Sequence, residues 1–309
     1  MGYGLWAMGY GLWAMGCASQ CEERPNNALS PTNRKITRTY RKKRKIMKIH
    51  HLRNATFVIE SGEHHILIDP MLSDKGALPP FSHLRHKPKR NPIVSLPDNA
   101  WQILDKVTLC LITHSQKLGI ELLTHTDHLD PPGKSFLRKN NIPVVCHEHD
   151  AAYMEKNEIN VKAKLYYWQA EQLLDGRITA IPALHGHSWM NYFMANGAGF
   201  YLKLPDEPSI YISGDTVYTD DVDRVLYELR PDIAVVAAGC ASLDLGGPIL
   251  MPLEEIITFI KNAPNKVIAN HLESLNHCPT SRSQLKQELE KNDLLSKTLI
   301  PHDGETLTI

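Results

Sequence analysis

The segment 124–130, Thr-His-Thr-Asp-His-Leu-Asp, brings His125, Asp127 and His128 within four positions of one another. Imidazole nitrogens and carboxylate oxygens together are suitable ligands for Zn²⁺, Mn²⁺ or Fe²⁺. In an extended or turn conformation the two histidines need not share a face, so they could contact two ions or two sides of one ion. Because such clusters also occur in ordinary polar turns, the segment indicates a metal site only if other ligands join it.

Three further strand-like apolar runs each end in a histidine or an aspartate. These side chains are His185 after 178–183, Asp215 after 211–213 and His271 after 267–269. A single histidine at the end of a strand is more often a surface or capping residue than a ligand. Four separate segments that each deliver His or Asp are harder to explain in this way, because a rigid scaffold builds a metal site from the ends of several elements. We therefore expect the four segments to meet at one metal site.

The segments that carry these side chains belong to an alternation of predicted strands and helices. Short runs rich in apolar residues and bounded by turn residues indicate strands at 57–60, 65–69, 109–113, 143–146, 178–181, 199–203, 209–213, 233–237 and 266–270. Helices are expected over 151–157, 222–229, 253–262 and 282–290. The strands fall into two groups, each followed by helices, which predicts an α/β fold with two sheets and helices packed outside them. Residues 71–100 are predicted to form a long loop, a feature that is often functional.

The first 46 residues differ from the rest of the chain in composition. They hold nine basic and two acidic side chains, whereas residues 47–309 hold 25 and 32. A heptapeptide occurs twice, at 1–7 and 8–14, and residues 41–45 are all basic. Such a basic run is typical of a nuclear-import signal, of a contact with an anionic surface, or of a solvated tail. We expect 1–46 to be a disordered extension and the working domain, 47–309, to begin near Met47.

Overall composition narrows the class of protein. The 309 residues suffice for one large domain or two small ones. A net charge of zero argues against a dedicated nucleic-acid binder. Since the longest apolar run falls short of the roughly 20 residues that cross a bilayer, no membrane partner is expected. Six scattered cysteines are typical of reduced thiols in a cytoplasmic protein.

Several segments besides the candidate ligands form a pattern across residues 47–309. They are 53–56, 67–72, 91–94, 214–216, 246–248, 271–278 and 301–306. With these segments the chain resembles the metallo-β-lactamase fold superfamily of metal-dependent hydrolases, and within it the branch similar to ascorbate-6-phosphate lactonase. The resemblance implies an αββα sandwich with two adjacent ions at one edge of the sheets, Zn²⁺ or else Mn²⁺ or Fe²⁺. Carried over residue by residue, it assigns His125 and His185 to the first ion, Asp127, His128 and His271 to the second, and Asp215 to both.

The remaining histidine of the family motif His-x-His-x-Asp-His is displaced in this chain. His125 is preceded directly by Thr124, but Leu-Ile-Thr-His-Ser at 111–115 lies upstream, and removal of 116–124 would restore Thr-His-Ser-His-Thr-Asp-His. In one arrangement His114 remains a ligand and the nine residues loop out, which costs little closure entropy. In the other, the run 120–123 replaces the pairing strand and the first site lacks a ligand. The sequence leaves both arrangements open.

With both ions bound, the expected chemistry is hydrolysis by a metal-bound hydroxide, since coordination lowers the pKa of water from 15.7 to about 7. Asp127 is the predicted catalytic residue, because it would bind the second ion and also orient the nucleophile. The expected partner is a small-molecule substrate, an anionic ester, lactone or phosphoester, which the basic side chains within 85–90 could contact.

Two alternative functions remain at this point. An insertion that breaks the first site would leave a non-catalytic or single-metal relic of the fold, whereas a phospholipase D-like hydrolase of the same fold would act on lipid headgroups. His187, Glu273 and His277 are candidates for supporting the ligands or for contacting the substrate. Cys240 and Cys278 are expected to be bystanders.

Overall fold

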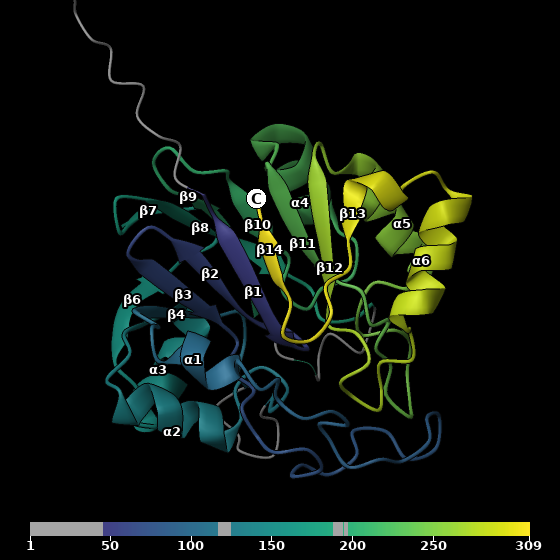
Figure 1. Cartoon of the computed structure of the whole chain (residues 1–309), viewed down its shortest axis with the longest axis horizontal. Helices are drawn as coiled ribbons and strands as arrows, with labels where there is room; N and C mark the ends of the chain where they lie inside the picture. The colour runs from purple at the N-terminus through teal and green to yellow at the C-terminus, as the bar shows by residue number, and fades with distance from the viewer. Residues whose placement is uncertain (1–45, 117–124, 188–193, 195–196) are drawn as a thin grey trace, which may run out of the picture. The chain divides into compact units, whose positions relative to one another are not determined.

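The structure is a computed structural model that describes residues 46–116, 125–187, 194 and 197–309. These residues form two seven-stranded sheets (Figure 1). The first has the order β14-β1-β2-β3-β4-β5-β6, with β1 at Lys48–Arg53, β2 at Thr56–Ser61, β3 at His64–Ile68, β4 at Leu109–Ile112, β5 at Val144–His147, β6 at Val161–Leu165 and β14 at Thr306–Thr308. The second has the order β13-β12-β11-β10-β9-β8-β7, with β7 at Ala170–Leu173, β8 at Gly176–Ala183, β9 at Gly197–Lys203, β10 at Ile210–Ile212, β11 at Ile233–Ala237, β12 at Lys266–Asn270 and β13 at Thr298–Leu299.

Each sheet is antiparallel in one half and parallel in the other. Strands β14, β1, β2 and β3 pair antiparallel, and β3 to β6 pair parallel. In the second sheet β7 to β10 are antiparallel and β10 to β13 are parallel. The carboxyl ends of neighbouring parallel strands meet at the same edge of a sheet, so side chains that follow β10 and β12 are brought together at one edge of the second sheet.

The core lies in three layers, one between the sheets and one outside each of them. On β2, Phe57 and Ile59 face the layer between the sheets while Val58 packs in the outer layer of the first sheet, as expected from the alternation of side chains along a strand. On β4, Leu111 lies in the inner layer and Ile112 in the outer one. Strands buried on both faces explain the continuous apolar runs in the sequence.

Helices cover the outer face of each sheet (Figure 1). Beside the first sheet lie α1 at Ala100–Leu104, α2 at Pro131–Lys139 and α3 at Glu148–Lys156. Beside the second lie α4 at Asp220–Arg224, which continues as a π-helical turn at Val225–Leu229, then α5 at Leu253–Asn262 and α6 at Arg282–Lys291, followed by a 3₁₀ turn at Leu295–Lys297. The predicted αββα sandwich is confirmed. Of the described helices, none has the length and apolar character needed to cross a membrane.

The strands and helices expected from the sequence are all present, with ends shifted by up to three residues. Helix α2 was not expected, because Pro131, Pro132 and Gly133 open it. Proline is tolerated in the first turn of a helix, where its missing N–H would have no intrahelical partner. The N–H of Gly133 instead donates to the N-cap carboxylate of Asp130 at 2.8 Å. Helix α1 at Ala100–Leu104 and the strands β1, β6, β7, β13 and β14 were also not predicted.

The predicted long loop is present. Between β3 and α1, the described residues 69–99 form no helix or named strand, and an isolated bridge joins Leu78 to Asn91. The extension 1–45, with its repeats and its basic run, lies outside the described residues. The division at Met47 therefore stays a prediction.

Candidate metal centre

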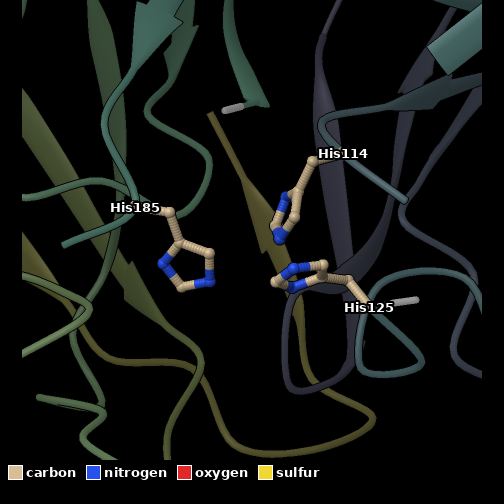
Figure 2. A group of neighbouring side chains, drawn as sticks. All are labelled: His114, His125 and His185. Carbon is tan, nitrogen blue, oxygen red and sulfur yellow. The ribbon is translucent and has the colours of Figure 1, made fainter. Parts of the chain in front are cut away.

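Three histidines from separate segments converge beside the end of β4. His114 follows β4, His185 follows β8, and His125 precedes the turn 126–128. One ring nitrogen of each lies within 4.8 Å of those of the other two, and Figure 2 shows the rings turned toward one another. The ring centroids of His114 and His125 are 4.6 Å apart, and His185 lies 5.2 Å from each of them. Three imidazoles in this arrangement suit one ion with a further position open.

Ser115 joins the two ends of the interrupted motif. Its carbonyl oxygen accepts a hydrogen bond from the backbone N–H of His125 at 2.8 Å. The chain therefore leaves this point after Ser115 and returns to it at His125. His114 consequently lies in the cluster, as in the first of the two arrangements that the sequence allowed. The run 120–123, on which the other arrangement depended, lies outside the described residues.

A second cluster contains Asp127, His128, Asp215 and His271, whose candidate ligand atoms also lie within 4.8 Å of one another. The Nε2 atom of His128 is 3.1 Å from Oδ2 of Asp215, and that of His271 is 3.6 Å from the same oxygen. Nε2 of His185, from the first cluster, is 3.8 Å from it. Asp215 thus lies between the clusters, at the position expected of a carboxylate that reaches two ions.

Buried nitrogen and oxygen atoms with no partner indicate that these residues fit metal ions. Nε2 of His114 and His271 and Oδ1 of Asp215 are buried and form no hydrogen bond with any described residue. An unpaired buried polar atom costs about 1–3 kcal/mol, and several of them facing one another are rare in folded proteins. Coordination of one cation in each cluster would satisfy these atoms. Both clusters therefore have donor sets suited to Zn²⁺, Mn²⁺ or Fe²⁺.

Neighbouring groups fix the orientation of the rings. Nδ1 of His128 lies 2.9 Å from Oδ2 of Asp69, a carboxylate that also accepts hydrogen bonds from the backbone N–H and the hydroxyl of Thr113. Nδ1 of His185 lies 2.7 Å from the carbonyl oxygen of Ile249. A histidine that donates through Nδ1 presents Nε2 to a metal. The sequence placed Asp69 in a family segment without a role, although it too follows directly on a strand.

Cys278 is a buried neighbour of a candidate ligand, and its expected role as a bystander to the chemistry stays a prediction. Its Sγ atom lies 3.5 Å from Nδ1 of His271. Burial raises the pKa of this thiol well above its usual value, so it is a neutral partner for the imidazole. Cys240 instead contacts the carbonyl oxygen of Ala238, as a bystander would. The contact at Cys278 could not be read from the sequence, because it depends on the loop that follows His271.

Burial sets the protonation state of the first cluster. It lowers the pKa of His114 well below the ordinary value, that of His125 to about 3, and that of His185, and neighbouring imidazoles add to the effect. These rings are therefore neutral at physiological pH, which is the form that binds metals.

In the second cluster, opposite charges rather than burial decide the direction of the pKa shifts. Burial alone would lower the pKa of His128, but the carboxylates of Asp215, Asp69 and Asp127 raise it well above its usual value. Burial would raise the pKa of Asp215, yet His128 and His271 keep it well below the ordinary range. The carboxylates therefore attract positive charge into the cluster, and a bound cation would compete with the proton on His128.

Of the three residues expected to support the ligands or to contact the substrate, His277 lies near a cluster, whereas His187 and Glu273 do not. His187 is exposed, with Nε2 2.8 Å from the Glu255 carboxylate, and Glu273 pairs with Arg282 at 2.7 Å. Neither contacts a candidate ligand. His277, by contrast, is buried near the second cluster, where burial lowers its pKa to about 4 against the opposing charge of Asp127. Its ring lies edge-on to Phe81 of the long loop, with centroids 5.2 Å apart.

The basic side chains of the long loop are engaged in part with the backbone. Arg85 donates to the carbonyl oxygen of Gly246, and Arg90 donates to those of Gly76 and Ala77. Lys87 and Lys89 are exposed. Arg90 therefore fastens the loop to itself, and Arg85 fastens the loop to the segment at Gly246.

The sequence matches the family model described as the beta-lactamase superfamily domain over residues 64–271. UPF0173 protein YddR of Bacillus subtilis is 33% identical over 266 residues, which are 85% of this chain and 100% of that protein. A UPF0173 metal-dependent hydrolase of Pyrococcus furiosus is 26% identical over 265 residues, 85% of this chain and 100% of its own length.

Solved structures agree with this match. The isothiocyanate hydrolase from Delia radicum gut bacteria superposes with a TM-score of 0.75 at 31% identity, covering 85% of this chain and 99% of its own. A possible metal-dependent hydrolase from Veillonella parvula gives a TM-score of 0.76 at 26% identity, covering 85% and 100%. The narrower resemblance to ascorbate-6-phosphate lactonase stays a prediction. The chain belongs to the beta-lactamase superfamily and is a metal-dependent hydrolase.

Proposed function

We propose that this hydrolase holds two metal ions, Zn²⁺ in the first instance, and uses them to add water to an electrophilic carbon of a small, largely apolar organic molecule. The observation that carries the proposal is the pair of buried clusters whose unpaired atoms face one another around Asp215. His114, His125 and His185 would hold the first ion, Asp127, His128 and His271 the second, and Asp215 would contact both. When bound, such ions supply Lewis acidity and an activated water at neutral pH.

Asp127 is the proposed catalytic residue. It is 7% exposed, whereas His128 and His271 of the same cluster are fully buried, so its carboxylate is the member of the cluster nearest to solvent. Burial would raise its pKa, but His128 and His125 keep the value below that of an ordinary aspartate. An ionised carboxylate in this position can accept a proton from the attacking water and orient it toward the substrate.

Apolar side chains beside the clusters favour an apolar substrate. Ile249 contacts His185 through its carbonyl oxygen, and Cys278 contacts His271 through Sγ. Both belong to a buried apolar cluster against which partly buried apolar side chains pack. These are Leu78, Phe81, Met194 and Leu243. Ligand sites are mostly lined by apolar groups with a few directed polar ones. Together with the arginines engaged on backbone carbonyls, these apolar neighbours favour an uncharged substrate over the anionic one expected from the sequence.

Isothiocyanates are the first substrate class to test, because the structural relative at 31% identity is named an isothiocyanate hydrolase. Addition of water to the central carbon of R–N=C=S, followed by loss of carbonyl sulfide, releases the amine R–NH₂. A neutral aryl ester and lactone test the wider class, and a sugar phosphate lactone and a phosphodiester test the anionic one. Exposed Lys87 and Lys89 are the observation that keeps the anionic class as the second candidate.

The test combines metal analysis with these substrates. The wild-type protein is expected to hold two ions per chain and to release amine, while Asp127→Ala and His271→Ala remain folded and lose at least about 100-fold in kcat/KM, or about 2.7 kcal/mol. His187→Ala, which removes an exposed histidine close in sequence to His185, is the matched control and should retain activity. A folded wild-type protein with one ion or none and no turnover of any substrate would instead support the single-metal relic.

A further inference from the structure

A buried hydrogen-bond junction at Ser115 holds the two histidines that flank the interruption of the metal motif. His114 is covalently attached to Ser115, and the backbone N–H of His125 donates to the Ser115 carbonyl oxygen at 2.8 Å. Ser115 is 1% exposed. The relative position of the two imidazoles thus depends on how firmly Ser115 itself is held.

Asp150, in the first turn of α3, holds Ser115 from the other side. Its Oδ1 atom accepts the backbone N–H of Ser115 at 3.0 Å and the Ser115 hydroxyl at 2.5 Å. One residue further on, the side-chain amide of Gln116 donates to the carbonyl oxygen of His149 at 3.3 Å. The start of α3 therefore binds the chain at the point where it departs into 117–124.

The burial of this carboxylate needs an explanation. Asp150 is 2% exposed, and it forms no salt bridge with any residue that the structure describes. Removing a carboxylate from water without a cation is unfavourable. The helix N-terminus offsets part of this cost, but Glu148, half-buried in the same turn, would serve that purpose without full burial. What the buried position adds is the double contact with Ser115.

We propose that Asp150 is a positioning residue of the first metal site: it fixes Ser115, which in turn sets His114 and His125 at the separation that one ion requires. This inference rests on the proposed function of the two clusters. Ligands must be held to within about 0.5 Å for a metal site to work, and an interruption between two ligands removes the covalent link that would do so. The contact between Asp150 and Ser115 takes its place.

The second cluster is held by different groups, so the proposed effect is selective. Asp69 binds Nδ1 of His128, and Cys278 contacts Nδ1 of His271. Neither of these contacts passes through Asp150. Loss of the Asp150 carboxylate is therefore expected to weaken the binding of the first ion and to leave the second ion bound.

The experiment measures Co²⁺ binding to the metal-stripped full chain, by stoichiometry, by affinity and by the visible absorption of each bound ion. Asp150→Ala is expected to weaken the first ion about 10- to 100-fold, as for other supporting groups of metal ligands, with the second ion bound as in wild type. Excess metal should restore kcat. Asp150→Asn keeps an acceptor oxygen and is expected to retain both ions.

A matched control exists in the same chain. Oδ2 of Asp232 accepts the backbone N–H of Ser209 at 2.8 Å and its hydroxyl at 2.7 Å, the same pair of contacts at the start of β10. Asp232→Ala is expected to leave both affinities unchanged. If Asp150→Ala does not fold, Ser115→Ala removes only the hydroxyl contact, and a several-fold weakening of the first ion alone is expected.

The results separate this inference from the proposed function. Wild-type affinities for both ions in Asp150→Ala, or in a folded Ser115→Ala that stands in for it, would overturn the positioning role. Equal loss of affinity for both ions would also overturn it. The same holds if Asp150→Asn binds the first ion as weakly as Asp150→Ala does. If the wild-type protein itself binds fewer than two ions, the proposed two-metal function fails first.

Discussion

The Nδ1 atom of His128 lies 2.9 Å from Oδ2 of Asp69, and both side chains are buried. The same carboxylate accepts two hydrogen bonds from Thr113, which directly precedes His114. Asp69 therefore supports candidate ligands of both clusters although it is itself no member of either. A carboxylate that fixes a metal-binding imidazole in this way also raises its basicity.

Asp69→Ala is therefore expected to weaken metal binding about 10- to 100-fold and to lower the free energy of unfolding by about 3–5 kcal/mol, because His128 and Thr113 lose a buried partner. Metal titration and chemical denaturation measure the two effects. Asp98→Ala, at an aspartate in the loop before α1, is the control. Unchanged metal affinity in Asp69→Ala would show that the contact only stabilises the fold.

Asp215 distinguishes a two-metal site from a one-metal site. Because its Oδ2 atom lies within 3.1–3.8 Å of His128, His271 and His185, Asp215→Ala is expected to weaken both ions. His185→Ala should weaken the first ion alone. Elemental analysis at a series of free metal concentrations separates the two variants, and identical losses in both would argue against two distinct sites.

The interruption of the motif should be dispensable for metal binding. Ser115 O and His125 N are already 2.8 Å apart, so removal of 116–124 closes a short gap and is expected to change the free energy of unfolding by less than about 1 kcal/mol. The shortened protein should retain two ions per chain. Retention of a single ion would mean that the segment itself contributes to the first site.

The metal-free protein is expected to lose stability as pH falls below 6.5. His114, His125, His185 and His277 have folded-state pKa values lowered by burial, to about 3 for His125 and about 4 for His277. In the unfolded chain each takes up a proton near pH 6.5, so each contributes up to about 1.4 kcal/mol of lost stability per pH unit below that value. The raised pKa of His128 adds nothing to this loss, because below pH 6.5 that ring is protonated in both states. Thermal unfolding of chelator-treated protein at pH 6.0 and 5.0, below the range in which His128 contributes, tests the direction; a transition temperature that rises toward pH 5.0 would contradict it.

Phe81 should influence the choice of substrate. Its half-buried ring packs against His277 beside the second cluster, so Phe81→Ala removes apolar contact surface without touching a candidate ligand. An increase in KM is expected for substrates with a bulky apolar group, of about 10-fold for 1.4 kcal/mol of lost contact. The smallest member of the same series should be affected least. An equal change in KM for all substrates of the series would mean that the apolar group of the substrate binds away from Phe81.

Sequence reasoning reached the fold and most of the candidate site, because strand ends are local features. His185, Asp215 and His271 each follow an apolar run, and that pattern is visible without a structure. The place of His114 was not decidable, since it depends on a hydrogen bond between Ser115 and His125. The contacts of Asp69 with His128 and of Cys278 with His271 were missed for the same reason, because such contacts exist only after loops distant in sequence have packed together.

Each sheet contributes only part of either cluster. His114, His125, Asp127 and His128 belong to connections of the first sheet, whereas His185, Asp215 and His271 follow strands of the second. Neither sheet alone can offer a complete set of ligands, so an ion can be held tightly only after the two have packed against each other. Metal binding and the packing of the two sheets are therefore linked, so whatever separates the sheets would also release a bound ion.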